Sequence, residues 1–253
     1  MGTIDKALHM LDVLSRLSGE AGLTELAELA SMDSATARRF LLALERHGYV
    51  EHLCGVRKYR LGAAPLRLAR IRETRYPLLR SAIPYVDRLA EDVGETVHLS
   101  EYDGRSLSIV YVRNSTQANR VAVDVGSDLP LHATASGIAF LATQPDQFVD
   151  DVLSCQLLKY TEHTVTAPEL IKRAVFDARL AGFSYNKQGL DIGVISTAAA
   201  FIGSGGSCIG AISIAAPVDR VSERKVLEFG SKVAAAARDL STAMSGEEVP
   251  ERR

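Results

Sequence analysis

Residues 23 to 44, LTELAELASMDSATARRFLLAL, hold two short apolar repeats separated by a break. The apolar positions of the first segment recur with a helical period, at Leu23, Leu26, Ala27 and Ala30. After the break the same period restarts, at Ala37, Phe40, Leu41 and Leu44. Asp33 and Ser34 supply side-chain oxygens where the second helix needs an N-terminal cap. The pattern therefore predicts a helix-turn-helix at about residues 23–44.

The opposite face of the second predicted helix is polar and begins with small residues. Small residues let a helix lie deep in the major groove of DNA, and arginines one turn later reach base edges or phosphates. We therefore expect DNA contacts from Ser34, Ala35, Thr36, Arg38 and Arg39. Amphipathic helices with solvated arginines also occur in ordinary helical domains, so the flanking sequence has to distinguish the two interpretations.

The flanking sequence predicts a winged form of the motif. Apolar residues within 4–17 recur with a helical period and mark a first helix. Gly48 ends the recognition helix, and residues 49–53 and 57–61 then alternate like the two strands of a hairpin. A hairpin wing contacts the phosphate backbone, which positions a protein without reading sequence. We assign this role to Arg57, Lys58 and Arg60.

Charge is unevenly distributed along the chain. The whole chain has 29 Lys and Arg against 31 Asp and Glu, with a pI of about 6.3. Between Asp33 and Arg75 there are ten basic and four acidic residues, a net charge of +6, so the remainder carries −8. This is the distribution expected of a DNA-binding module joined to an acidic body.

Length and composition set further bounds. At 253 residues the chain accommodates two domains, and 47% hydrophobic with 24% charged residues indicate a globular protein. The sequence contains no run of about 18 apolar residues, so it predicts no membrane-spanning helix. The N-terminal MGTIDKALHML lacks the pattern of a signal peptide. Three scattered cysteines without a CxxC pair indicate a reducing cytoplasm. GxGxxG, P-loop and HExxH motifs are absent, so we expect no cofactor and no metal.

The domain organisation follows from the change of pattern after residue 62. We expect a DNA-binding domain at 1–62, a linker helix at 63–77 and a second domain at 78–246. In the second domain we expect strands at about 95–101, 107–112, 120–125, 183–185, 194–201 and 208–215. We expect helices at about 82–93, 133–142, 168–181 and 222–244. The glycine-rich residues 203–207 fit a hairpin turn better than a phosphate loop. The fold class is α+β, with an antiparallel sheet flanked by helices.

The second domain shows no catalytic constellation. His98 lies in a predicted strand and His132 at a helix start. Either could serve acid/base chemistry, because histidine titrates near neutrality, but we expect a structural role with a bond to a nearby backbone group. Asp124, Asp128 and Asp191 are separate acidic positions, with no spacing that indicates a catalytic dyad. We therefore predict no catalytic residues and no enzyme. Two alternatives remain: an enzyme with an accessory winged helix, and a protein-docking scaffold, which would show no salt-dependent DNA binding.

Segments along nearly the whole chain occur in the order found in one known family. At the front these are residues 4–14, 36–44, 48–50 and 59–62. In the second domain they are GETVHL at 94–99, LPLHATASG at 129–137, AGF at 181–183, the run 193–201 and ISIAAP at 212–217. Together they resemble the IclR family of bacterial transcription regulators.

The resemblance implies a winged helix-turn-helix joined by a helical linker to a GAF-like effector domain. It implies a homodimer or homotetramer on a palindromic operator of double-stranded DNA near catabolic genes, acting as a repressor more often than as an activator. The implied effector is a small organic or aromatic acid. Family positions that contact its carboxylate correspond to Ala135, Ser136, Asn186, Ser196 and Ser213, and apolar wall positions correspond to Val121, Leu129 and Val194.

Three positions depart from the family pattern. Ala215 replaces a second serine on the final strand, Asn186 an acidic residue, and Ser196 a cysteine. The pocket thereby loses one hydroxyl and one side chain that could carry a charge, so we expect an aromatic or aliphatic acid with an apolar body rather than a very small oxo-acid. One hydrogen bond contributes only about 0.5–1.5 kcal/mol, which changes preference without fixing identity.

Overall fold

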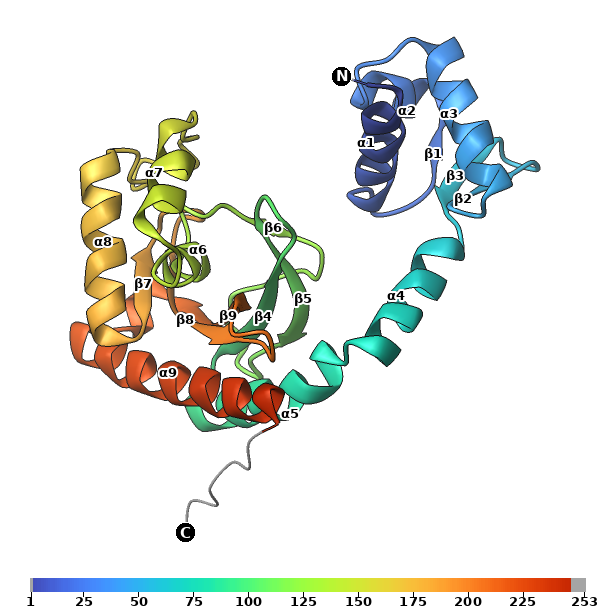
Figure 1. The fold of residues 1–253 in the computed structure, drawn as a ribbon. Coiled ribbons are helices and arrows are strands. Elements are labelled where there is room, and N and C mark those ends of the chain that lie inside the picture. Colours follow the sequence, from blue (N-terminus) through green and yellow to red (C-terminus); the bar gives the residue numbers. More distant parts are fainter. Residues whose placement is uncertain (1, 247–253) are drawn as a thin grey trace. The chain divides into compact units, whose positions relative to one another are not determined.

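The computed structural model describes residues 2–246. The chain divides into two compact units, one ending at Pro77 and one starting at Leu78, and each is described by itself (Figure 1). The first unit contains α1 (Thr3–Ser15), β1 (Ala21–Gly22), α2 (Leu23–Leu29), α3 (Ser34–Arg46), β2 (Val50–Leu53), β3 (Lys58–Leu61) and α4 (Ala64–Arg75). No helix within the described residues has the length and apolar character needed to cross a membrane.

Local chemistry explains the helix-turn-helix of the first unit. The Asp33 carboxylate accepts the backbone N–H of Thr36 at 2.9 Å and caps α3, and this hydrogen bond lowers the pKa of Asp33. Beyond α3, Gly48 takes a φ of +75°, which favours glycine, and the chain turns into β2. Met10, Leu26 and Leu41 are fully buried between the three helices.

The hairpin and the linker helix also follow the sequence pattern. Strands β2 and β3 pair antiparallel, as the alternation predicts, and the two-residue strand β1 adds to the outer edge of β3. Strand β1 was not predicted, because two residues are too short to show a period. Helix α4 begins at Ala64 with Pro65 in its first turn, where a missing N–H costs nothing.

The second unit is built on one six-stranded antiparallel sheet. In order across the sheet its strands are β6 (Asp128–Leu129), β5 (Leu107–Arg113), β4 (Thr96–Tyr102), β9 (Cys208–Pro217), β8 (Val194–Ile202) and β7 (Ser184–Lys187). Residues 203–207 form the turn between β8 and β9, with Gly206 at a φ of +75° and the Gly203 N–H donating to the Ser207 carbonyl at 2.9 Å. The prediction of a hairpin turn there is confirmed.

Helices cover both faces of this sheet (Figure 1). On one face lie α5 (Leu78–Val93) and α9 (Glu223–Ser245), which share a buried cluster with Val97, Leu99, Ile212 and Ile214 of the central strands. On the other side lie α6 (Ala135–Leu141), α7 (Asp146–Ser154) and α8 (Pro168–Ala181). The predicted α+β class with an antiparallel sheet and flanking helices is confirmed, although α7 was not predicted and α5 begins four residues earlier than expected.

The third predicted strand, at residues 120–125, is wrong. These residues belong to an irregular segment between β5 and β6, residues 114–127, which we call the strap. Side chains hold the backbone of its middle part: the Thr96 hydroxyl donates to the Val121 carbonyl at 2.9 Å, and Arg220 donates to the Asn119 carbonyl at 2.5 Å. Its last residues bond to a strand, through the backbone of Ile109 in β5. Arg220 also donates to the carboxylate of Glu95, at 3.1 and 2.7 Å, and Glu95 is only 1% exposed.

Candidate DNA-binding surface and ligand pocket

The residues predicted to contact DNA lie on one side of α3 and on the β2–β3 hairpin. Ser34, Ala35, Arg38 and Arg39 are exposed in the first half of α3, whereas Thr36 is half-buried beside its cap. Within residues 2–246 the guanidinium groups of Arg38 and Arg39 form no salt bridge, so no carboxylate competes with DNA phosphates for their charge. The Arg39 guanidinium lies 5.3 Å from the ring centre of Phe40.

The three predicted wing residues differ in their surroundings. Arg57 and Lys58 are exposed at the end of the hairpin, and Arg57 takes a φ of +55° in the turn. Arg60 donates to the Glu51 carboxylate on the neighbouring strand at 2.9 Å, and this interaction raises its pKa. Arg60 therefore carries a charge that is partly neutralised already, while Arg57 and Lys58 present theirs to solvent.

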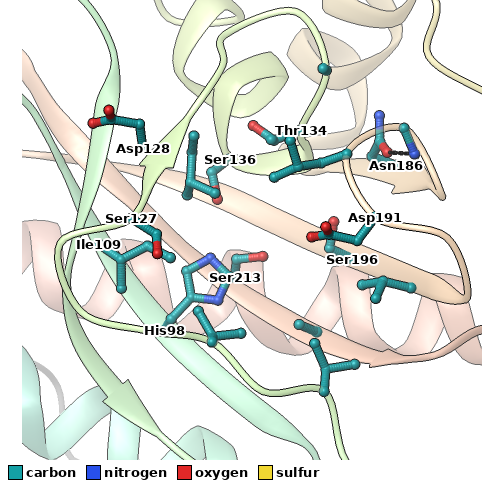
Figure 2. A pocket seen from close by; sticks show the side chains of 18 of the residues that line it. His98, Ile109, Ser127, Asp128, Thr134, Ser136, Asn186, Asp191, Ser196 and Ser213 are labelled. Atoms are coloured by element: carbon teal, nitrogen blue, oxygen red, sulfur yellow. Dashed lines mark hydrogen bonds between the residues drawn. The ribbon is translucent and has the colours of Figure 1, made fainter. Parts of the chain in front are cut away.

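A cavity of about 160 Å³ opens in the second unit between the central strands, the start of α6, the strap and the loop before β8 (Figure 2). This is below the roughly 300–1,000 Å³ of sites for drug-sized ligands, so it fits a small metabolite. Eight of the nine predicted effector positions line it: Val121, Leu129, Ser136, Asn186, Val194, Ser196, Ser213 and Ala215. Residues from far-separated segments are thus brought together around one space.

Ala135 is the ninth position, and its side chain does not line the cavity. It is 0% exposed and packs against Ala139 and Ala198 in the core. Its carbonyl accepts the Ser184 hydroxyl at 2.6 Å, which fixes this turn of α6 over the sheet. Ser136, the next residue of the helix, points into the cavity instead (Figure 2).

Two side chains in the cavity wall have buried polar atoms without partners. His98 of β4 and Ser213 of β9 are paired in register on neighbouring strands and lie side by side (Figure 2). They are 5% and 1% exposed, and neither ring nitrogen of His98 nor the Ser213 hydroxyl has a hydrogen-bond partner in the described chain. Burial lowers the pKa of His98 to about 4, so the ring is neutral at pH 7. Buried polar groups are normally satisfied, so these three atoms are candidates to bond a ligand or an ordered water in the cavity.

The two histidines therefore differ in their hydrogen bonding. The expectation that His98 bonds a nearby backbone group is wrong, whereas His132 fulfils it, with its Nε2 atom 2.9 Å from the Leu158 carbonyl oxygen. The sequence did carry a signal that His98 faces the cavity. Successive side chains of a strand point to opposite faces of the sheet, and Val97 and Leu99 on either side of His98 pack in the cluster with α5, so His98 faces the other side.

The cavity wall also includes residues that were not predicted to bind an effector. Ile109 adds to the apolar wall, and Thr134 caps α6 by accepting the Gly137 N–H at 2.9 Å. Asp124 and Asp128 line the same space as Asp191, which is distant from them in sequence, and the lining set contains no lysine or arginine. Among the described residues no group of three or more His, Cys, Asp or Glu side chains is arranged to hold a metal ion.

Comparison with known proteins identifies the class that this fold and these two surfaces define. The family model for the IclR helix-turn-helix domain matches residues 3–53, and the model for the bacterial transcriptional regulator IclR C-terminal domain matches residues 73–242. The chain belongs to the IclR family of bacterial transcriptional regulators. It is therefore a DNA-binding regulator with a separate C-terminal domain.

Individual relatives agree over almost the whole chain. The transcriptional repressor IclR of Escherichia coli strain K12 is 27% identical over 247 residues, which cover 96% of this chain and 90% of the relative. The glycerol operon regulatory protein of Streptomyces coelicolor is 27% identical over 243 residues, covering 96% and 94%. A crystal structure of a putative IclR transcriptional regulator from Silicibacter sp. TM1040 superposes with a TM-score of 0.85 at 34% identity, covering 98% of each chain.

Proposed function

We propose that this regulator is a repressor of catabolic genes whose affinity for a palindromic operator is controlled by a small organic acid bound in the cavity. It acts as a homodimer or homotetramer, because a palindrome needs two recognition helices about 34 Å apart or a multiple of that distance. The unpartnered His98 and Ser213 side chains carry the ligand-binding part of this proposal. The repressors among its relatives support the direction of control.

The chemistry of the inner wall suits a carboxylate. The hydroxyls of Ser136, Ser196 and Ser213 are potential donors, and a neutral imidazole offers one N–H from His98. The Asn186 Oδ1 atom accepts the Gly189 N–H at 2.8 Å, so its amide N–H₂ group remains for a ligand (Figure 2). The apolar walls would hold the hydrocarbon body of the acid.

Binding rather than turnover is the proposed role of the cavity. His98 and Ser213 are neighbours but form no hydrogen bond with each other, so the described residues offer no activated nucleophile there. Purified protein that converts a bound acid to product would overturn this part of the proposal.

The DNA-binding part is tested on α3. A duplex is first selected from a random library by the wild-type protein, and binding is then measured for Arg38→Ala combined with Arg39→Ala. We expect a loss of about tenfold or more for each arginine, together with relaxed sequence preference. The control removes two exposed arginines of the second unit, Arg105→Ala with Arg224→Ala, and has the same change in net charge. Equal losses in both variants would show that only overall charge matters and that the α3 assignment is wrong.

A further inference from the structure

The charged residues around the cavity do not match a simple anionic ligand. All three charged side chains in its wall are aspartates, Asp124, Asp128 and Asp191. His98 is the remaining titratable group, and burial lowers its pKa to about 4, so it supplies no positive charge at pH 7. The three aspartates are exposed, so solvent weakens their effect, but a monocarboxylate would still approach three negative charges with no lysine or arginine in the cavity wall.

One of these aspartates points into the space and is unengaged. The side chain of Asp191 forms no hydrogen bond or ion pair within residues 2–246, and Figure 2 shows its carboxylate directed into the cavity. Asp128, by contrast, points away and accepts the hydroxyls of Ser106 and Ser108 at 3.5 and 3.3 Å. Of the two aspartates labelled in Figure 2, Asp191 is therefore the one placed to meet a ligand.

The loop that carries Asp191 is held in place by neighbouring groups. The Gly193 N–H donates to the Gln188 side chain at 2.8 Å, and the hydroxyls of Thr161 and Thr164 each donate at 2.6 Å, to the Gln188 and Gly189 carbonyls respectively. These bonds tie both ends of the loop. The carboxylate is therefore presented from a defined backbone rather than from a free segment.

We infer that the effector carries a positively charged nitrogen that binds Asp191, in addition to the acid group that faces His98 and Ser213. The effector class is an amino acid or a related zwitterion with an apolar body. This inference rests on the proposed function, because it names the ligand of the same cavity. A zwitterion brings its own cation, so its nitrogen can pair with Asp191 while its acid group occupies the hydroxyl-lined end.

One neighbouring cation offers a competing explanation. Arg120 of the strap lines a shallow depression next to the cavity together with Asp191. The two side chains form no salt bridge in the described chain. If Arg120 compensated Asp191 in solution, a plain carboxylate would bind as well as a zwitterion, and the following comparison separates the two cases.

The test uses the full chain and matched pairs of ligands that differ only by an amine. Suitable pairs are β-alanine and propionate, aminomethylbenzoate and methylbenzoate, and phenylalanine and phenylpropionate, with melting temperature and calorimetric affinity as readouts. We expect an amine-bearing member to raise the melting temperature and to bind at least about tenfold more tightly than its partner. Asp191→Asn should remove that advantage, whereas the charge-matched Asp219→Asn, on the exposed turn after β9, should keep it.

Two results would overturn the inference: no pair favours its amine-bearing member, or the advantage survives in Asp191→Asn. The same preparation is assayed for binding to the selected duplex. Duplex binding that is altered by an acid without an amine would retain the proposed function and reject the zwitterion. Absence of any salt-sensitive duplex binding would reject the proposed function instead.

Discussion

Replacing Arg220 by glutamine tests how the strap is held over the cavity. Arg220 donates twice to the carboxylate of Glu95, which is 1% exposed, and once to the carbonyl of Asn119 in the strap. Without the guanidinium, Glu95 is left as a buried charge with no compensating partner, and breaking such a pair costs about 3–5 kcal/mol. For a unit of this size, that corresponds to a fall in melting temperature of about 6–20 °C.

The measurement is calorimetric unfolding of the full chain, with two companion variants. Lys172→Gln breaks an exposed pair with Asp150, 2.8 Å long with side chains 43% and 51% exposed, and should cost under about 1 kcal/mol. Adding Glu95→Gln to the Arg220 variant removes the buried charge and should recover part of the loss. If Arg220→Gln costs no more than Lys172→Gln, Glu95 is not an uncompensated buried charge and the reasoning fails.

Three further changes probe the sheet and the cavity. In Gly210→Ala the new Cβ would lie 1.9 Å from the Ser100 backbone oxygen on β4, so the two strands must separate. We expect the free energy of unfolding to fall by about 1–3 kcal/mol, and an unchanged melting temperature would contradict this expectation. Burial lowers the pKa of His98 to about 4 in the folded protein, whereas in the unfolded chain it is near 6.5. The free energy of unfolding should therefore rise between pH 4 and pH 6.5, by up to about 3 kcal/mol. Urea unfolding at each pH measures this profile, and His98→Asn should flatten it. Ser213→Ala removes a buried hydroxyl without a partner, so the stability of the unliganded protein should stay constant or rise by about 1 kcal/mol, while its affinity for the effector falls. A clear loss of stability without ligand would show that the hydroxyl does have a partner.

Local signals made several elements predictable from the sequence. Helix α8 runs over Pro168–Ala181, as expected, because Pro168 marks its start and Gly182 takes a φ of +74° after its end. Asp33 marks the start of α3 in the same way. Each signal lies within a few residues of the boundary that it sets, so no distant contact was needed.

The strap was not predictable for the opposite reason. Val121, Val123 and Val125 alternate with polar or small residues and look like a strand. Their conformation depends on Thr96 and Arg220, which are distant in sequence, and no local pattern shows those hydrogen bonds. Distance in sequence likewise hid the fact that Asp191 lines the same cavity as Asp124 and Asp128.

Strand β4 has different partners on its two sides. His98 faces the cavity, whereas the residues before and after it, Val97 and Leu99, pack in the cluster formed with α5 and α9. Helix α5 starts at Leu78, immediately after the residue where the DNA-binding unit ends. A ligand that displaced the imidazole would also move the two neighbouring residues of β4, whose side chains pack in the cluster that α5 shares.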